Sequence, residues 1–202
     1  MPFPIKNFEF PKGVSIYFQE VHKNSISYRG EFISDKEKVG YFDRNPKLFA
    51  IEKTKTDLLV SHFGENVLLE KQASGKPLPI NGQCISLSHS GDLVALATSI
   101  SPVGIDLQEF SPKLERIRAK FVSENEEQLM SESLIEFNPI HFLWCAKEAV
   151  FKIYGENLPF KHIEAQRLDL SKNGSITFSL NNGNTHQVYY SFFGNFCFAV
   201  AI

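Results

Sequence analysis

The amino-acid sequence predicts an α+β protein. Segments typical of strands and of helices are interspersed along the chain, and hairpin turns join several of the strands, whereas a doubly wound sheet would show steady alternation of strand and helix. The chain has 202 residues, 43% of them hydrophobic, and contains 19 phenylalanines. That is enough for one sizeable aromatic-rich core or two smaller ones.

Charge and cysteine usage narrow the class of protein. The formal net charge of -2 argues against a general nucleic-acid binder. Cys84, Cys145 and Cys197 are scattered and lack a C-x-x-C spacing, which argues against a disulfide framework and favours a reducing compartment. No apolar run approaches about 20 residues, and the N-terminus has no signal-peptide core, so we expect a cytoplasmic protein without a membrane span.

The first third of the chain has a mixed pattern. Partial alternation predicts strands at residues 13–21 and 25–33. The stretch 36–55 is basic and polar, and a helix is expected from about Thr56, where "TDLLVSHFGENVLLE" begins. Turn-forming residues fill positions 74–83, so this part of the chain should be a loop.

From residue 84 onward the elements are better defined. Turn residues and capping signals separate the apolar segments. The expected elements are strands at 84–90, 93–99 and 103–108, a helix opening at Ser111–Pro112, a second helix opening at the capping box Ser123 to Glu126, and a closing hairpin or meander over 175–202 with turns at Asn182–Gly183 and Gly194–Asn195.

The best-defined helix is expected over "PIHFLWCAKEAVFKIYG", from Pro139 to a stop at Gly155. Leu143, Ala146, Val150 and Ile153 form an apolar stripe at helical spacing. Trp144, Glu148 and Lys152 share the opposite side. One interpretation is an ordinary surface helix with a Glu–Lys pair four residues apart; the other is that this side presents a carboxylate, an ammonium and an indole to a site.

Polar residues at three places suggest such a site. His89 ends a predicted strand, Asp106 and Gln108 share one face of another, and the helix contributes Glu148. An Asp, an amide oxygen and a Glu are ligands that Mg²⁺ takes, with water and substrate phosphate completing the coordination. Lysines and a histidine nearby suit a phosphate-rich ligand.

Each of these residues also has a purely structural interpretation. Asp106 can cap a loop, and His89 can be a satisfied turn histidine. Glu126 is explained by the capping box alone, and Gly75–Lys76–Pro77 is explained as a turn. The order and spacing of the motifs are more specific than any single one of them.

In that order and spacing the sequence resembles the 4′-phosphopantetheinyl transferase superfamily, in particular its larger, two-repeat type. The motifs that carry the resemblance are Gly75–Lys76–Pro77, Ser88–His89–Ser90, Gly104-Ile105-Asp106-Leu107-Gln108, Phe121-x-Ser123-x-x-Glu126, and Trp144-x-x-Lys147-Glu148-Ala149 followed by Lys152. The aspartate strand followed by the W-x-x-K-E-A motif is the most specific part.

The resemblance implies a reaction and a set of roles. Members of this family move the phosphopantetheine arm of coenzyme A onto a serine of an apo acyl or peptidyl carrier protein and release adenosine 3′,5′-bisphosphate. The positions matching Asp106 and Glu148 bind Mg²⁺. Gln108 is a departure, because many members have a glutamate ligand there. The implied catalytic set is Asp106, Glu148, Lys152 and Glu126, with the general base left open between Glu126 and Glu148 acting through water.

The resemblance also implies the partners of coenzyme A and the fold. The matching coenzyme A contacts are Lys55, Lys76, Ser88, His89, Lys147 and Lys152, with Lys36 and Lys38 as weaker alternatives to Lys55. Two similar α+β halves, 1–103 and 104–202, should be related by a pseudo-twofold with the ligand cleft between them. Such a chain would contain a whole site and act as a monomer.

A basic segment beside the metal strand suggests a docking surface. Lys113, Arg116, Arg118 and Lys120 follow the predicted strand 103–108 with Glu115 as the single acid among them. The family's carrier proteins present an acidic helix beside the reactive serine, so we expect Lys113, Arg116 and Lys120 to dock the carrier protein. The alternative is an ordinary solvated face.

Two other classes of function remain open on the sequence. A metal-dependent phosphoesterase would use the same acids and histidine, although it typically needs more carboxylates. A non-catalytic module that binds carrier proteins or nucleotides would explain Gln108 as a sign of lost metal binding.

Overall fold

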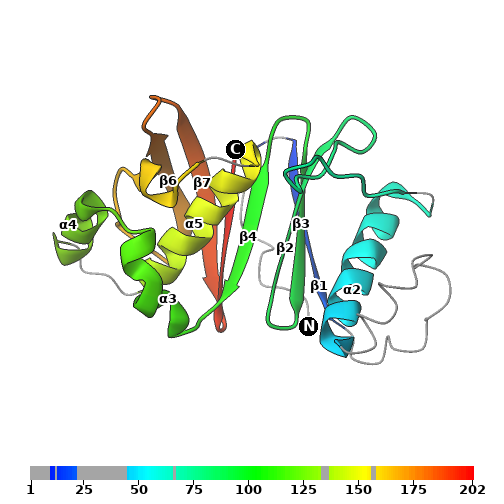
Figure 1. The fold of residues 1–202 in the computed structure, drawn as a ribbon, viewed down its shortest axis with the longest axis horizontal. Coiled ribbons are helices and arrows are strands. Elements are labelled where there is room, and N and C mark those ends of the chain that lie inside the picture. Colours follow the sequence, from blue (N-terminus) through cyan, green and yellow to red (C-terminus); the bar gives the residue numbers. More distant parts are fainter. Residues whose placement is uncertain (1–9, 12, 22–44, 66, 133–136, 156–157) are drawn as a thin grey trace.

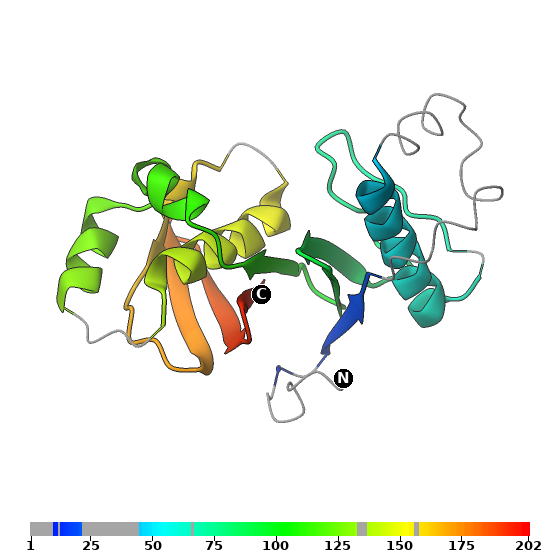
Figure 2. The same ribbon diagram turned by 90° about the horizontal axis from the view of Figure 1, so that it is seen from below.

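The computed structural model describes residues 10–11, 13–21, 45–65, 67–132, 137–155 and 158–202. Within these residues the chain forms two antiparallel sheets side by side, each packed against one long helix (Figure 1). The predicted α+β class is confirmed. Figure 2 shows that the two sheets approach each other where β2 (Cys84–Ser90) meets β4 (Gly104–Glu109).

The N-terminal sheet has three strands. It consists of β1 (Val14–Glu20), β3 (Leu93–Ser99) and β2 in that spatial order, and both pairings are antiparallel. Helix α2 (Pro46–Phe63) packs against it through buried side chains that include Ile51, Leu58 and Leu59. These contact Val94 and Leu96 of the central strand in one apolar cluster.

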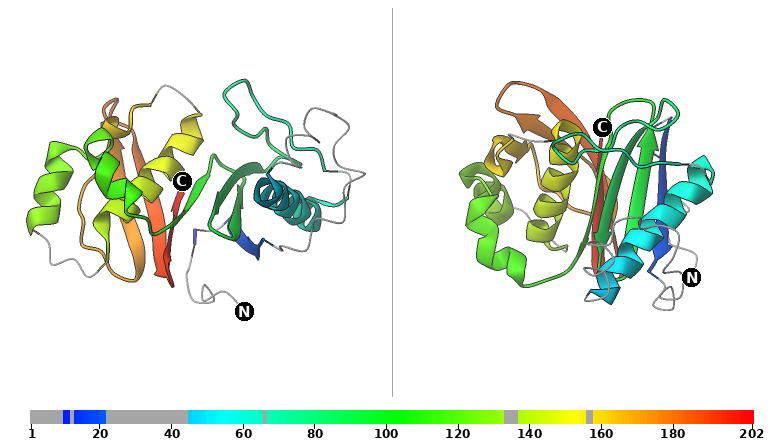
Figure 3. Two further views of the ribbon diagram at one scale, coloured as in Figure 1. Left: turned by 60° about the horizontal axis from the view of Figure 1, so that its bottom comes forward. Right: turned by 45° about the vertical axis from the view of Figure 1, so that its right-hand side comes forward.

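The C-terminal sheet has five strands, in the spatial order β4-β8-β7-β6-β5. Its other strands are β5 (Ile163–Ala165), β6 (Asn173–Leu180), β7 (Thr185–Phe193) and β8 (Phe196–Ala201). Helix α5 (Pro139–Tyr154) lies across it (Figure 3). The remaining elements are α3 (Lys113–Ile117), the 3-10 turn η2 (Arg118–Lys120), α4 (Glu124–Glu132) and the 3-10 turn η3 (Phe160–His162).

Local sequence explains where α5 begins and ends. The Asn138 side chain accepts the N–H groups of Ile140 and His141 at 3.0 and 3.1 Å, and Pro139 follows at the first helical position. Gly155 stops the helix with φ near +91°, a conformation that favours glycine. The predicted bounds of this helix are therefore confirmed.

The helix is more buried than the two-sided interpretation expected. Trp144 packs between Phe121 and Phe160, with ring centroids 5.1 and 5.3 Å away, so the indole belongs to the core cluster rather than to a presented face. Residues on most sides of α5 are buried because the sheet covers one side and the segment containing α3 and α4 contributes core side chains from another.

Gly104 allows β4 and α5 to touch. A Cβ atom at this position would lie 1.9 Å from the carbonyl oxygen of Ala149 and 3.3 Å from Cβ of Lys152. Any larger residue would force the helix away from the strand. Gly104 therefore determines how closely α5 approaches β4, the strand that carries Asp106.

The opposite faces of the two sheets share a third apolar core. Ile105 and Leu107 of β4 and Phe198 of β8 cluster with Ala95 and Ala97 of β3. Since side chains alternate along a strand, Asp106 points to the other face, toward α5. This arrangement confirms the predicted alternation of apolar and polar residues in the G-I-D-L-Q strand.

Two predictions for the first third differ from the structure or lie outside it. The helix expected from Thr56 begins ten residues earlier, at Pro46, and ends at Phe63, because Asn45–Pro46 opens it and Gly64 stops it. The predicted strand 25–33, with Lys36 and Lys38, lies outside the described residues. Among the described helices, none combines the length and apolar character needed to cross a bilayer.

Candidate active site

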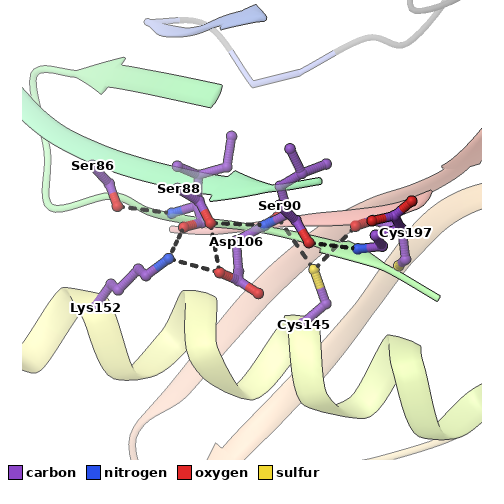
Figure 4. A network of polar contacts seen from close by, with 10 residues as sticks. Ser86, Ser88, Ser90, Asp106, Cys145, Lys152 and Cys197 are labelled. Carbon is purple, nitrogen blue, oxygen red and sulfur yellow. Dashed lines mark hydrogen bonds and ion pairs between the residues drawn. The ribbon is translucent and has the colours of Figure 1, made fainter. Parts of the chain in front are cut away.

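The candidate active site is built around the line where β2 and β4 meet. Each is an edge strand of its own sheet. Three serine hydroxyls of β2 accept main-chain N–H groups of β4: Ser86 from Ile105 at 3.0 Å, Ser88 from Leu107 at 3.1 Å, and Ser90 from Glu109 at 2.8 Å (Figure 4). The residue numbers rise together, so the strands run parallel and hydroxyls replace main-chain pairing. We call these residues the serine ladder.

Asp106 is held from several sides. Its Oδ1 accepts a hydrogen bond from the Ser88 hydroxyl and one from the Lys152 ammonium, both at 2.7 Å (Figure 4). Its main-chain oxygen accepts from the Cys145 thiol at 3.2 Å. The residue is 7% exposed, so the carboxylate is fixed and largely buried. These bonds form with β2 and α5, so the loop-cap interpretation of Asp106 does not apply.

Lys152 connects this carboxylate to the helix. Its ammonium donates to the main-chain oxygen of Ile105 at 2.8 Å as well as to Asp106, and its side chain is 26% exposed. The ordinary surface Glu–Lys interpretation is therefore wrong for this lysine, because its described partners lie on β4.

Glu148 shares the site with Asp106. The pKa of Glu148 is raised from 4.5 to about 7, chiefly by burial and also by the nearby Asp106 carboxylate, while the Lys152 ammonium opposes the shift. A cation bound beside both carboxylates would favour their ionised forms.

A pocket of about 220 Å³ adjoins these residues. Its lining includes side chains from α2, the 71–77 loop, β2 and α5, and it contains four lysines: Lys55, Lys71, Lys76 and Lys152. Glu52 also lines it and pairs with Lys55 at 2.6 Å. The excess of ammonium groups suits a ligand with several phosphates. Sequence reasoning missed Lys71, because its position depends on a loop closed by an isolated bridge between Lys71 and Pro77.

Lys76 also contacts helix α5. Its ammonium donates to the main-chain oxygen of Ile153 in the last turn of α5. A cation at a helix C-terminus is favourable, because that end carries partial negative charge. Gly75–Lys76–Pro77 is thus a turn that also aims a lysine at α5.

His89 lies on the accessible side of β2. Partial burial lowers its pKa, the nearby Lys55 ammonium lowers it further, and Glu52 opposes this. Lys152 lowers the same pKa and Asp106 raises it, both to a smaller degree. A neutral imidazole there can donate a hydrogen bond to a phosphate oxygen without adding positive charge beside the lysines.

Gln108 lies two residues beyond Asp106 on the same face of β4. Its amide nitrogen donates to the main-chain oxygen of Glu109 at 2.6 Å, which fixes the side chain beside its own strand. Metal ligation by Gln108 stays a prediction.

The carboxylates of the site match the ligands that magnesium uses. The described residues contain no group of three or more His, Cys, Asp or Glu side chains suited to a metal. Asp106 and Glu148 supply two carboxylates, and this fits Mg²⁺, which usually takes one or two carboxylates and keeps water and substrate phosphate as other ligands. The residues therefore fit a metal that binds together with its substrate.

Two predicted site residues are not in this site. Lys147 and Glu126 are fully buried and paired at 2.6 Å. The Lys147 ammonium also donates to main-chain oxygens of Phe121 and Phe160, at 2.6 and 3.2 Å. The predicted contact of Lys147 with coenzyme A is therefore wrong, because the helix turns this lysine into the core.

Glu126 has the structural role that the capping box predicts. It accepts the N–H of Ser123 at 3.0 Å while Ser123 accepts the Glu126 N–H at 3.2 Å, and its other oxygen accepts the N–H of Ala165. With every described bond internal and no exposed surface, Glu126 is unsuited to the predicted catalytic role. Ser88, predicted to contact coenzyme A, is 6% exposed and uses its hydroxyl within the protein.

The predicted docking residues lie on the surface beyond β4. Lys113, Arg116 and Lys120 are exposed on α3 and η2. Arg118 differs, because it forms ion pairs with Glu127 and Glu115. Nε2 of His141 on α5 lies 2.7 Å from the main-chain nitrogen of Ser111. This contact fixes the start of the basic segment. The exposed basic surface therefore consists of three cations rather than four.

Comparison with known proteins agrees with this geometry. Residues 102–201, about half of the chain, match the 4′-phosphopantetheinyl transferase superfamily. The chain is 33% identical over 120 residues to the 4′-phosphopantetheinyl transferase psf-1 of Bacillus pumilus, covering 57% of this chain and 51% of that protein. It is 28% identical over 127 residues to the 4′-phosphopantetheinyl transferase gsp of Aneurinibacillus migulanus, covering 62% and 53%.

A third relative extends the same pattern. The 4′-phosphopantetheinyl transferase ffp of Bacillus subtilis is 28% identical over 124 residues, covering 59% of this chain and 55% of its own. The chain thus spans about half the length of the curated relatives it matches. The matched family segment begins just before β4 and contains Asp106, Glu148 and Lys152. On this evidence the chain belongs to the 4′-phosphopantetheinyl transferase superfamily.

Proposed function

We propose that this protein transfers the 4′-phosphopantetheine group of coenzyme A to a serine of an apo acyl or peptidyl carrier protein, with Mg²⁺, and releases adenosine 3′,5′-bisphosphate. The observation that carries the proposal is Lys152, which lines the lysine-rich pocket and also bonds Asp106. One side chain thereby joins a phosphate-binding pocket to a pair of carboxylates suited to a metal.

The role proposed for each residue follows from where its side chain lies. Lys55, Lys71 and Lys76 would bind phosphate groups of coenzyme A at the pocket, and Lys152 would neutralise charge at the pyrophosphate. His89, on β2 outside the pocket lining, would donate to a further phosphate oxygen. Asp106 and Glu148 would hold Mg²⁺, which supplies charge neutralisation at the pyrophosphate when bound. The pocket of about 220 Å³ is smaller than the whole of coenzyme A, so it would take the phosphate-bearing end.

The reaction is a displacement at phosphorus. The serine oxygen of the carrier protein forms a bond to the β-phosphorus, the bond from that phosphorus to the bridging oxygen breaks, and the bisphosphate leaves with the electron pair. The serine proton must go to a base. Glu148, acting through a water molecule, suits this role better than Glu126, which is sealed in the core.

Two similar halves, 1–103 and 104–202, remain our proposal for the architecture. It is supported by the order of elements, because β1-α2-β2-β3 and β4-α5-β7-β8 each contain a strand, a helix and a hairpin. In both, the last strand lies between the other two, in the orders β1-β3-β2 and β4-β8-β7. A chain with both halves would act as a monomer with one cleft, and the carrier protein would dock on Lys113, Arg116 and Lys120.

The test is incubation of the protein with coenzyme A, Mg²⁺ and a panel of apo carrier proteins, read by intact mass. We expect one carrier to gain one phosphopantetheine group, and only when Mg²⁺ is present. Release of inorganic phosphate without mass gain would identify a phosphoesterase instead. Binding of coenzyme A without either reaction would identify a non-catalytic module.

A further inference from the structure

The three residues of the serine ladder do not have the same contacts. All three hydroxyls accept an N–H group of β4, but among the described contacts only the Ser88 hydroxyl donates to a side chain, the carboxylate of Asp106. Figure 4 shows Ser88 and Lys152 reaching the same oxygen of Asp106, one from β2 and the other from α5. Ser88 therefore holds both the main chain of β4, at Leu107, and the side chain of Asp106.

This double contact determines which carboxylate oxygen is available. Ser88 and Lys152 both bond to Oδ1, at 2.7 Å each, and Oδ2 has no hydrogen bond among the described residues. A carboxylate with one oxygen held by two donors cannot rotate freely. Its remaining oxygen is thus presented in a fixed direction, in which it would be available to a metal ion.

We propose that Ser88 is a positioning residue for the metal, which sets the orientation of Asp106 through its hydroxyl instead of contacting coenzyme A. This inference rests on the proposed function and assigns one donor in its metal site. Side chains that orient metal ligands in this way typically contribute 10- to 100-fold, as an order of magnitude, to metal affinity or activity.

Ser90 provides a matched control on the same strand. Ser88→Ala and Ser90→Ala each remove one hydroxyl that accepts an N–H group of β4, but only Ser88→Ala also removes a donor to Asp106. The experiment measures the dissociation constant of Mn²⁺ in the presence of coenzyme A by calorimetry, the Mg²⁺ concentration that gives half-maximal transfer, and the thermal midpoint of each variant.

We expect Ser88→Ala to weaken Mn²⁺ binding about 10- to 100-fold and to raise the required Mg²⁺ by a similar factor. Ser90→Ala should bind Mn²⁺ as the wild type does. Equal Mn²⁺ affinity in the two alanine variants would overturn the inference, and so would a wild type that binds no Mn²⁺ with coenzyme A. If Ser88→Ala does not fold, Ser88→Cys retains the volume with a weaker donor, and wild-type Mn²⁺ affinity in that variant would overturn the inference equally.

The outcome separates this inference from the proposed function. A wild type that modifies no carrier protein, but whose Mn²⁺ affinity falls in Ser88→Ala and not in Ser90→Ala, would refute the transfer reaction and support the role of Ser88. A wild type that transfers normally, with no difference between the two alanine variants, would support the reaction and refute the role of Ser88.

Discussion

Two lysines of helix α5 form ion pairs of similar geometry in opposite surroundings. Lys147 lies 2.6 Å from Glu126, and Lys152 lies 2.7 Å from Asp106. Each ammonium also donates to a main-chain oxygen. The first pair is sealed, with both side chains 0% exposed, whereas the second is open, with exposures of 26% and 10%.

The difference shows how one helix serves both fold and site. Five residues along a helix turn the side chain by about 140°, so the two lysines point to different neighbours. The sealed pair ties α5 to the start of α4 and to the N–H of Ala165 in β5. The open pair ties α5 to β4 beside a pocket. A buried pair surrounded by further bonds serves structure, and a pair with access to solvent is available to a ligand.

The largest expected effect comes from breaking the sealed pair. Lys147→Met should lower the free energy of unfolding by about 3–5 kcal/mol, because it leaves the Glu126 carboxylate buried without its partner. Urea unfolding measures this. The matched Lys152→Met should lower it by less, because Lys152 is partly exposed and Ser88 still donates to the Asp106 carboxylate.

A second variant sharpens that test. Adding Glu126→Gln to Lys147→Met removes the buried charge and should recover part of the lost stability, since the amide oxygen can still accept the N–H of Ala165. Near wild-type stability of Lys147→Met, together with weaker binding of coenzyme A, would contradict the structural role of the sealed pair.

The two carboxylates of the candidate site should affect the reaction instead. Asp106→Ala and Glu148→Ala are each expected to reduce the rate of transfer about a hundredfold or more, because each removes a carboxylate that would hold the metal. Circular dichroism melting should show smaller losses than for Lys147→Met. Full activity of either variant at ordinary Mg²⁺ concentrations would refute the metal assignment.

The pH dependence of stability should identify Glu148. Its pKa is raised in the folded protein, from 4.5 to about 7, so between these values the folded form binds a proton that the unfolded form has lost. Stability of the metal-free protein should therefore fall as pH rises across this range, by at most about 3 kcal/mol from this group and by less where water screens it. Unfolding in a chelator measures this, and Glu148→Gln should flatten the slope.

The smallest effect is expected at the docking surface. Reversing Arg116 and Lys120 to Glu should raise KM for the carrier protein several-fold, on the order of 1 kcal/mol, and leave KM for coenzyme A nearly unchanged. The difference should shrink as salt rises. Arg167→Glu with Lys172→Glu changes the net charge equally at exposed residues outside α3 and η2, and should have no such effect. Equal loss toward both substrates would assign the basic segment to the fold or to the coenzyme site.

Local signals made parts of this structure predictable. Asn138, Pro139 and Gly155 act on their own backbone, so the bounds of α5 could be read from the sequence. Alternation in β4 likewise placed Asp106 opposite Ile105. The start of α2 was missed because residues 46–55 contain four lysine or glutamate side chains and show weak periodicity, and tertiary packing against β3 decides the outcome.

The candidate site was less predictable, because its composition depends on contacts between distant segments. The W-x-x-K-E-A motif does not indicate that Lys147 pairs with Glu126 while Lys152 pairs with Asp106. The burial of each lysine depends on which residues of α4 and β4 pack beside the helix. The position of Lys71 likewise depends on closure of the 71–77 loop. One available signal was overlooked: serine at every second position of β2 indicates a polar stripe along one edge.

The serine ladder makes three amide protons of β4 sensitive to the contact between the two sheets. The amide protons of Ile105, Leu107 and Glu109 are bonded to hydroxyls of the other sheet and not to a neighbouring main chain. Their exchange with deuterium therefore reports whether β2 and β4 are in contact. Exchange of the amides that pair β4 with β8 reports whether the C-terminal sheet is intact. A motion that separates the two sheets without unfolding either would label three alternate amides of one strand and spare those between them.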